Sequence, residues 1–195
     1  MNFTLRHIAR NVALVAVAAF GLTYASGELM YASASPAVVQ TKAQSAQEHA
    51  LETLMSFYKP ALLGQFPGEV KGLTVGKSTR SDVDKLIGKA DVPGKDADAF
   101  DVYHAEMGHP GYAISYKLNK VREMRYFGTN VERETNIGGI TLKMLKQHWG
   151  KPTATTTIKN GKLVQQKVVY NRGSYALTFI FNDATHLDHI NLTKR

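Results

Sequence analysis

The feature that most constrains how this chain can fold is an internal repeat. Residues 74–90 and residues 140–152 share one pattern: a threonine where a helix N-cap belongs, a short amphipathic stretch, and a glycine at its end. The predicted N-caps are Thr79 and Thr141, and the predicted C-caps are Gly88 and Gly150. Each copy therefore predicts a short helix that is closed at both ends.

Antiparallel strands are predicted after each of these helices. Residues 112–116 (YAISY) match residues 175–179 (YALTF) in character, and both alternate large and small side chains at period two. A further strand is predicted after each, at residues 121–126 and 187–192, and one before each, at residues 100–103 and 164–170. The predicted turns are Asn119-Lys120, Ala184-Thr185-His186 and, ahead of residues 164–170, Asn160-Gly161. Because one copy of about 60 residues would be only marginally stable alone, the two copies are expected to share a core or a continuous sheet.

An amphipathic helix is predicted ahead of the repeat. Its stripe recurs at spacings of three and four residues and consists of Ala43, Gln47, Ala50, Leu51, Leu54, Met55 and Tyr58. Ser35 to Thr41 contains Pro36 and is predicted to be a flexible stalk. The predicted fold class is α+β: an N-terminal helix followed by two tandem units, each a short helical element plus an antiparallel sheet of three or more strands. The predicted organisation is a linker and helix at 35–70, a first unit at 71–133 and a second at 134–195, with 71–195 as one domain.

The first 34 residues have the pattern of an export signal. Met1 to Asn11 carries Arg6 and Arg10 without an acid, and Val12 to Leu22 is an apolar run of about 11 residues. Ala32-Ser33-Ala34 fits a cleavage site, so residues 1–34 are predicted to be a signal peptide and the protein to be secreted or extracytoplasmic. The alternative is an uncleaved N-terminal membrane anchor. Without cysteine the chain can form neither a disulfide nor a lipoprotein-type lipid linkage.

Four segments of the chain resemble one bacterial family. The segments are Thr74 to Ala90, Ile140 to Pro152 (ending in WGKP), Tyr175 to Phe181, and Asp188-His189-Ile190. In this order they resemble the YjgB-like family of uncharacterised proteins exported by Gram-positive bacilli, over about residues 50–195. The first copy departs from the pattern, because Ile87 stands in place of the tryptophan and Ala90 in place of the proline.

The doubled unit is also similar to the BLIP-like architecture, which is named for beta-lactamase inhibitor protein. Single units of this kind are shared by the SmpA/OmlA lipoproteins of outer-membrane assembly. These resemblances imply a fold and a place outside the cytoplasm, and they bring no established activity. Because BLIP-like proteins present a concave sheet to another protein, the resemblance implies a binding module by analogy of fold alone.

No motif for catalysis is found in the sequence. The chain has no G-x-S-x-G elbow for a serine nucleophile. The candidate groups for an enzyme are the loop His104, Glu106 and His109 and the corner Asp183, Asp188 and His189. Because residues three apart on a strand point to opposite faces, His186 and His189 are not expected to share a metal ion. The acids from Asp96 to Asp101 lie near a predicted turn and are expected to be solvated. The sequence predicts no catalytic residue, no metal site and no cofactor.

The chain is basic, with 24 Lys+Arg against 16 Asp+Glu and a formal net charge of +8. The basic residues are scattered without a block of five: Lys117, Lys120, Arg122, Arg125, Arg133, Lys143, Lys146, Lys151, Lys159, Lys162, Lys167, Arg172, Lys194 and Arg195. An exported protein of this charge is expected to favour anionic cell-wall polymers or lipid head groups, with an attraction that fades as salt rises. Nucleic acid is not an expected partner, because of the export signal.

Tyrosines on the predicted strands suggest a binding face. They are Tyr103, Tyr112, Tyr116, Tyr126, Tyr170 and Tyr175. Aromatic side chains anchor interfaces, although most of this set is expected to belong to the core. The leading hypothesis is an exported, non-catalytic module that binds a protein or a cell-envelope partner through the sheet face. The alternatives are a hydrolase of cell-wall polymers that uses the loop or the corner named above, and a structural or stress-response envelope protein.

Overall fold

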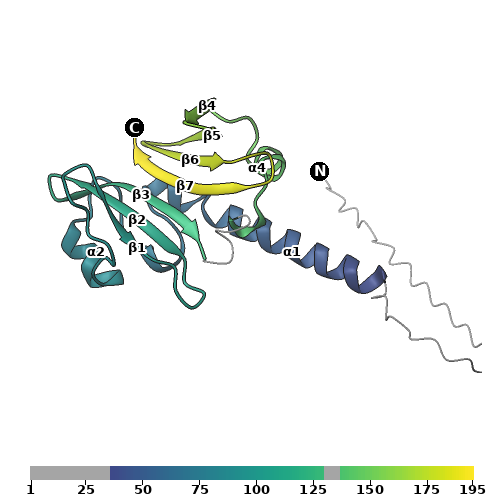
Figure 1. Ribbon diagram of the computed structural model, residues 1–195, viewed down its shortest axis with the longest axis horizontal. Coiled ribbons are helices and arrows are strands. Elements are labelled where there is room, and N and C mark those ends of the chain that lie inside the picture. Colours follow the sequence, from purple (N-terminus) through teal and green to yellow (C-terminus); the bar gives the residue numbers. More distant parts are fainter. Residues whose placement is uncertain (1–35, 130–136) are drawn as a thin grey trace, which may run out of the picture. The chain divides into compact units, whose positions relative to one another are not determined.

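The computed structural model describes residues 36–129 and 137–195, which belong to one compact unit (Figure 1). The helical elements are α1 (Pro36–Ser56), η1 (Pro60–Leu63), η2 (Gly68–Val70), α2 (Arg80–Ile87), η3 (Ile137–Gly139) and α4 (Leu142–Trp149). The strands are β1 (Phe100–Tyr103), β2 (Gly111–Lys117), β3 (Lys120–Gly128), β4 (Ala154–Asn160), β5 (Leu163–Arg172), β6 (Tyr175–Phe181) and β7 (Leu187–Lys194). The predicted signal peptide at 1–34 and the predicted boundary at 133 and 134 lie outside the described residues.

The strands form one continuous antiparallel sheet in the order β1-β2-β3-β7-β6-β5-β4. The described residues before position 130 supply β1 to β3 and are called the first half below, and those after position 136 supply β4 to β7 and are called the second half. The halves meet where β3 pairs with β7, with Glu123 opposite Thr193 and Tyr126 opposite Ile190. In Figure 1, β7 is the long curved strand between the two halves. The predicted α+β class, a helix followed by a large antiparallel sheet, is confirmed.

Both short helices have the predicted caps. The Thr79 side chain accepts a hydrogen bond from the backbone N–H of Asp82, and the Thr141 side chain accepts one from that of Met144. Gly88 ends α2 with φ +81°, and Gly150 ends α4 with φ +75°. The caps were predictable because each satisfies backbone groups within its own turn of helix.

The leading helix begins earlier than predicted. The stalk predicted for Ser35 to Thr41 is wrong from Pro36 onward, because α1 starts at that proline. Proline is tolerated in the first helical turn, where its missing N–H would have no intrahelical partner. The buried side of α1 holds Ala50 and Leu54 and continues to Phe57, whereas the predicted stripe residues Gln47 and Met55 are exposed.

Two hairpin turns are shifted by one residue from their predicted positions. Lys117 pairs with Lys120, so the β2–β3 turn is Leu118-Asn119. At the other hairpin Asn160 pairs with Leu163, so the β4–β5 turn is Gly161-Lys162. The pairing of whole strands sets the turn, because a slip of one residue would move every side chain to the opposite face of the sheet.

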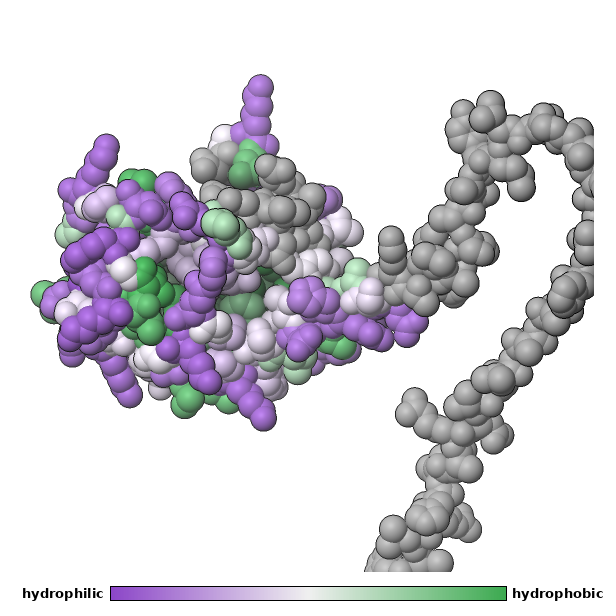
Figure 2. Space-filling model, turned by 90° about the horizontal axis from the view of Figure 1, so that it is seen from below, coloured by the Kyte–Doolittle hydropathy of each residue, from purple (hydrophilic) through white to green (hydrophobic). Residues whose placement is uncertain are grey.

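One core joins both halves of the molecule. Its largest fully buried side chains include Phe57 and Phe66 from the leading helical segments and Phe179 and Phe181 from β6. Figure 2 shows that hydrophilic side chains cover most of one face and enclose small hydrophobic areas. Asp101 corrects the expectation that the acids near Asp96 are solvated, because its side chain is 2% exposed and pairs with Arg80. No helix among the described residues is long and apolar enough to cross a membrane.

Candidate anion-binding site

The predicted tyrosine face is largely buried. Tyr103, Tyr112, Tyr116, Tyr170 and Tyr175 are 2–8% exposed, and Tyr126 is partly buried against the core. Burial raises the pKa of the Tyr112 and Tyr116 hydroxyls, as expected when the charged form loses its water. Their rings pack inward because β2, β5 and β6 turn these positions toward the helices. Binding of a partner through them stays a prediction, and it would require the sheet to uncover them.

The loop His104, Glu106 and His109 lies between β1 and β2, and all three residues are exposed. His109 pairs with Glu69, and the backbone N–H of His104 donates to Asp91 at 2.7 Å. The His109 ring is thus directed to Glu69, which lies on another segment of the chain. Among the described residues no group of three or more histidines and acids is placed to hold a metal ion.

The corner Asp183, Asp188 and His189 is divided into two separate pairs. Asp183 accepts the backbone N–H of Thr185 at 2.7 Å and bonds His186 Nδ1 at 2.6 Å. These bonds, led by the one from Thr185, lower the pKa of the Asp183 carboxyl. Asp188 instead bonds His189 Nδ1 at 2.5 Å.

A bulge in β7 explains the second pair. Ile180 stands opposite His189 and Phe181 opposite Leu187, so Asp188 is an extra residue in the ladder. A bulge breaks the alternation of faces, which lets two successive side chains meet. The sequence alone did not reveal this, because alternation assigns neighbouring residues to opposite faces.

The face of the sheet turned away from the core is polar near its centre. Glu123, Arg125, Asn191 and Thr193 lie there on β3 and β7, together with Thr178 on β6. They border a groove of about 290 Å³. Arg125 Nε donates to Glu123 at 2.8 Å, so the strongest charges of this groove neutralise each other. Among the described residues, its lining holds one lysine outside an ion pair, Lys167, where the larger hollow described next holds three.

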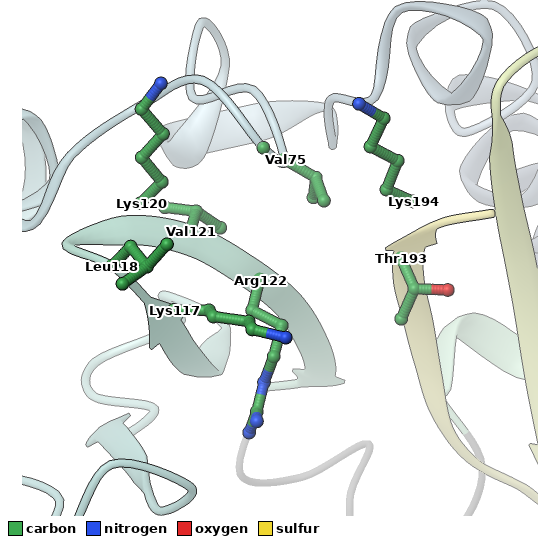
Figure 3. Close-up of a pocket in the computed structure, with 9 residues that line it drawn as sticks. Val75, Lys117, Leu118, Lys120, Val121, Arg122, Thr193 and Lys194 are labelled. Atoms are coloured by element: carbon green, nitrogen blue, oxygen red, sulfur yellow. The ribbon is translucent and has the colours of Figure 1, made fainter.

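A larger hollow of about 660 Å³ lies at one end of the sheet. It is lined by the β2–β3 hairpin, the end of β7 and the turn ahead of α2, and its lining residues are Val75, Gly76, Lys117, Leu118, Lys120, Val121, Arg122, Thr193 and Lys194. Figure 3 shows Lys120 and Lys194 extending in the same direction on either side of Val75. The lining contains four cationic side chains and no acid. This set is called the basic hollow below.

Backbone hydrogen bonds hold the walls of the basic hollow in place. The N–H of Gly76 donates to the carbonyl of Val121 at 2.7 Å, and the N–H of Val121 donates to that of Ser78 at 2.8 Å. Gly76 has φ +78°, which glycine adopts at little cost. The turn ahead of α2 is therefore tied to the start of β3, and Lys120 is kept beside it.

The cations of the basic hollow differ in their partners. Arg122 is neutralised, because it pairs with Asp98 at 2.5 Å and donates to the Ser115 hydroxyl at 3.2 Å. In the described part of the chain, no ion pair includes Lys117, Lys120 or Lys194. All three lysines are exposed. The fold thus places three lysines around one hollow without an ion-pair partner among the described residues. Lys117 also borders a neighbouring hollow of about 600 Å³, whose lining includes Asp96 and Asp98.

The sequence did not predict this site. Lys117, Lys120 and Lys194 were all recognised as basic, but they were judged to be scattered. Lys120 and Lys194 meet only because β3 pairs with β7. The local signal that was available is the pair of lysines flanking Leu118-Asn119, which marks a basic hairpin tip.

The fold and the site together define a class: an α+β protein with one continuous antiparallel sheet and a cationic hollow at one end of it. The chain matches the family model described as "Domain of unknown function (DUF4309)" over residues 54–193. It therefore belongs to the DUF4309 family.

The YjgB protein of Bacillus subtilis is similar over most of its length, in sequence and in structure. The "Uncharacterized protein YjgB" of Bacillus subtilis is 34% identical over 169 residues, which cover 85% of this chain and 87% of that protein. The crystal structure of the DUF4309 family protein YjgB from the same organism superposes with a TM-score of 0.67 at 36% identity, covering 76% of this chain and 99% of that one. The predicted resemblance to the YjgB-like family is confirmed.

Proposed function

We propose that this protein is an exported, non-catalytic binding module for an anionic partner of the cell envelope. The observation that carries the proposal is the meeting of Lys117, Lys120 and Lys194 in one open hollow without a carboxylate partner. Like charges brought together repel one another, so the arrangement lowers the stability of the free protein. An anionic ligand would remove that repulsion on binding.

Export is the second part of the proposal. Residues 1–34 carry the charge and hydropathy pattern of a signal peptide with an A-x-A site. Mass spectrometry of the protein recovered outside the cell tests this part. A chain that begins at Ser35 is expected, whereas a chain that keeps residues 1–34 and sediments with membranes would favour the anchor.

The repeat belongs to the proposal as well. We infer that the two halves are BLIP-like units joined through their last strands. The threonine N-cap and glycine C-cap shared by α2 and α4, and the antiparallel β2–β3 and β6–β7 hairpins, support this inference. A solved structure of either half, expressed alone, would test this inference. Because a unit of about 60 residues is only marginally stable, we expect such a half to fold when a second copy covers its apolar face.

The binding test uses the chain from Ser35, which contains the whole compact unit and its core. We expect it to co-sediment with purified cell envelopes at low salt and to be released as salt rises, because exposed charges are screened. The variant K117E/K120E should lose this binding. The matched control is K159E/K162E, which makes the same change of charge in the β4–β5 hairpin, where both lysines are also exposed. Equal loss in both variants would show a dependence on net charge alone and would overturn the assignment of the site.

A further inference from the structure

The tip of the β2–β3 hairpin breaks a rule of hairpin turns. Leu118 and Asn119 form the two-residue turn with φ +51° and +60°. Such turns favour Asn-Gly, because most side chains are strained at positive φ. Asn119 tolerates this region, but Leu118 has no local hydrogen bond to gain from it.

Leu118 also gains nothing from packing. Its side chain is 91% exposed, although it is one of the larger apolar residues of the chain. The folded molecule thus holds a strained apolar side chain in water at the end of a hairpin. Strain that the fold does not need is a reason to look for function at that position.

A second hairpin in the same sheet shows that the leucine is not needed for the turn. The β4–β5 hairpin also has a two-residue turn with exposed lysines, Lys159 before it and Lys162 within it. There Gly161 takes the positive φ, +59°, in the ordinary way. The two tips differ at the first turn position, which is leucine in the β2–β3 hairpin and glycine in the β4–β5 hairpin. The β4–β5 hairpin carries its exposed apolar residues, Leu163 and Val164, after the turn, where they are about half exposed.

Leu118 belongs to the lining of the basic hollow, between Lys117 and Lys120 in the sequence and beside them in Figure 3. An apolar tip surrounded by cations matches the surface of an anionic bilayer. Lysines lie at the level of the lipid phosphates while an apolar side chain enters the acyl boundary. A purely anionic polymer would use the lysines and leave Leu118 in water.

We infer that the β2–β3 tip docks on an anionic phospholipid bilayer, with Leu118 inserted below the head groups and Lys117, Lys120 and Lys194 bound to the phosphates. This inference rests on the proposed function and names its partner. Because one apolar side chain and three lysines contribute, the binding is reversible and weakens as salt rises.

The test is sedimentation of the chain from Ser35 with vesicles of equimolar phosphatidylglycerol and phosphatidylcholine. The decisive variant is L118N, which removes the apolar side chain and places a residue that tolerates positive φ. It is expected to lower partitioning about tenfold. K117E/K120E should lower partitioning at least about twentyfold. Vesicles of phosphatidylcholine alone should bind none of the proteins measurably.

A matched control distinguishes insertion of Leu118 from nonspecific adsorption of any exposed apolar side chain. Met107 lies in the β1–β2 loop with φ +46° and is 99% exposed, outside the basic hollow. M107N should leave partitioning unchanged. L118N and L118G should unfold in urea at or above the wild-type midpoint, because both residues accept this turn more easily than leucine.

Each other outcome has a definite meaning. If L118N binds vesicles like the wild type while K117E/K120E does not, the insertion is overturned and the anion-binding function stands. Binding to cell walls without binding to vesicles would overturn the bilayer in favour of an anionic polymer. If K117E/K120E binds walls and vesicles like the wild type, the proposed function fails, and the inference fails with it.

Discussion

The β2–β3 and β6–β7 turns occupy corresponding places in the two units proposed above. Both turns are exposed, but they differ in length, polarity and charge. The first is two residues long, apolar at its tip and flanked by lysines. The second spans residues 182–186 and is closed by Asp183, which bonds Thr185 and His186. The strands on either side are alike because the sheet requires them to be. The turn residues are not constrained by strand pairing or by the core, so they can differ between the halves. Functional residues are common in such loops for the same reason.

The cores of the halves differ in a similar way. In the second half, α4 brings Trp149 against Tyr170 and Phe179, with ring centroids 5.3 Å apart in both contacts. In the first half, α2 instead supplies Arg80, which pairs with buried Asp101 and lies 4.1 Å from the centre of the Tyr116 ring. The helix of the second half is therefore packed by aromatic rings, and the helix of the first half by an ion pair beside one ring. The strands of the first half have an aromatic cluster of their own, in which Tyr126 contacts Tyr112, Phe57 and Phe66.

The largest expected effect tests this difference of cores. Phe179→Ala should lower the free energy of unfolding by about 3–5 kcal/mol, because it leaves a cavity beside Trp149 and Tyr170. Asp101→Ala should lower it by about 1–3 kcal/mol, because it removes the partner of Arg80 and of the Gly94 N–H. Urea unfolding measures both. The loss for Asp101→Ala is expected to be the smaller one, because Arg80 is 46% exposed and can regain water when its partner is removed. A greater loss for Asp101→Ala than for Phe179→Ala would contradict this comparison of the two halves.

The glycine caps offer a test in which the halves should agree. Gly88 and Gly150 have φ +81° and +75° with ψ near the extended limit, and a Cβ at either would meet nothing within 4 Å. The cost of alanine is then conformational alone, about 1–3 kcal/mol at each position. We expect urea unfolding to give the same free energy for G88A and G150A within the error of measurement. A larger difference would show that the two glycine caps are not equivalent.

The N-caps should differ slightly. At α2 the caps are reciprocal, because the Thr79 N–H also donates to Asp82 at 2.8 Å, whereas at α4 residue 144 is a methionine. We expect Thr79→Ala to cost about 1.5 kcal/mol and Thr141→Ala about 1 kcal/mol. Serine at either position keeps the hydroxyl and serves as the control. Alanine at position 79 keeps the backbone N–H bond to Asp82 and loses the bond from the Thr79 hydroxyl to the same carboxylate. An equal cost for both alanine variants would mean that this hydroxyl bond contributes nothing.

These caps and strands show how far the sequence could be interpreted. Thr79, Gly88, Thr141 and Gly150 were predicted correctly, since each cap is satisfied within a few residues of itself. The register of the hairpins was missed by one residue, because it depends on which faces of distant strands are buried.

The smallest effect concerns pH and the β6–β7 turn. The pKa of Asp183 is lowered, so the folded protein holds this carboxylate more strongly than the unfolded chain does. The stability from its bonds is present above the unfolded pKa of about 3.9 and is lost as pH falls toward the folded pKa. Asp183→Asn should therefore reduce the decline of stability on acidification below about pH 4. L118N should leave that decline unchanged, because the β2–β3 turn carries no acid. Urea unfolding at several pH values measures the decline, and a smaller decline in L118N would contradict its assignment to Asp183.

The candidate site was less accessible to sequence reasoning than the fold. All four of its cationic residues stand among the basic residues of the sequence, but nothing in their spacing placed Lys194 beside Lys120. For the tyrosines the error was in the other direction. Their residue type suggested an exposed binding face, but their side chains lie on the side of the sheet that packs against the core. A residue's type shows what it can do, and only its neighbours decide whether a partner can reach it.

By itself the sequence determined the family, the α+β class, the capped helices and six of the seven strands, because caps and period-two patterns depend on residues close together in the chain. The strand β4 was not predicted. The tertiary structure decided which side chains are neighbours. Pairing β3 with β7 gathered three lysines into one hollow, folding the helices onto the sheet buried the tyrosines, and a bulge joined Asp188 to His189. These outcomes required the tertiary structure because each depends on contacts between segments far apart in the chain.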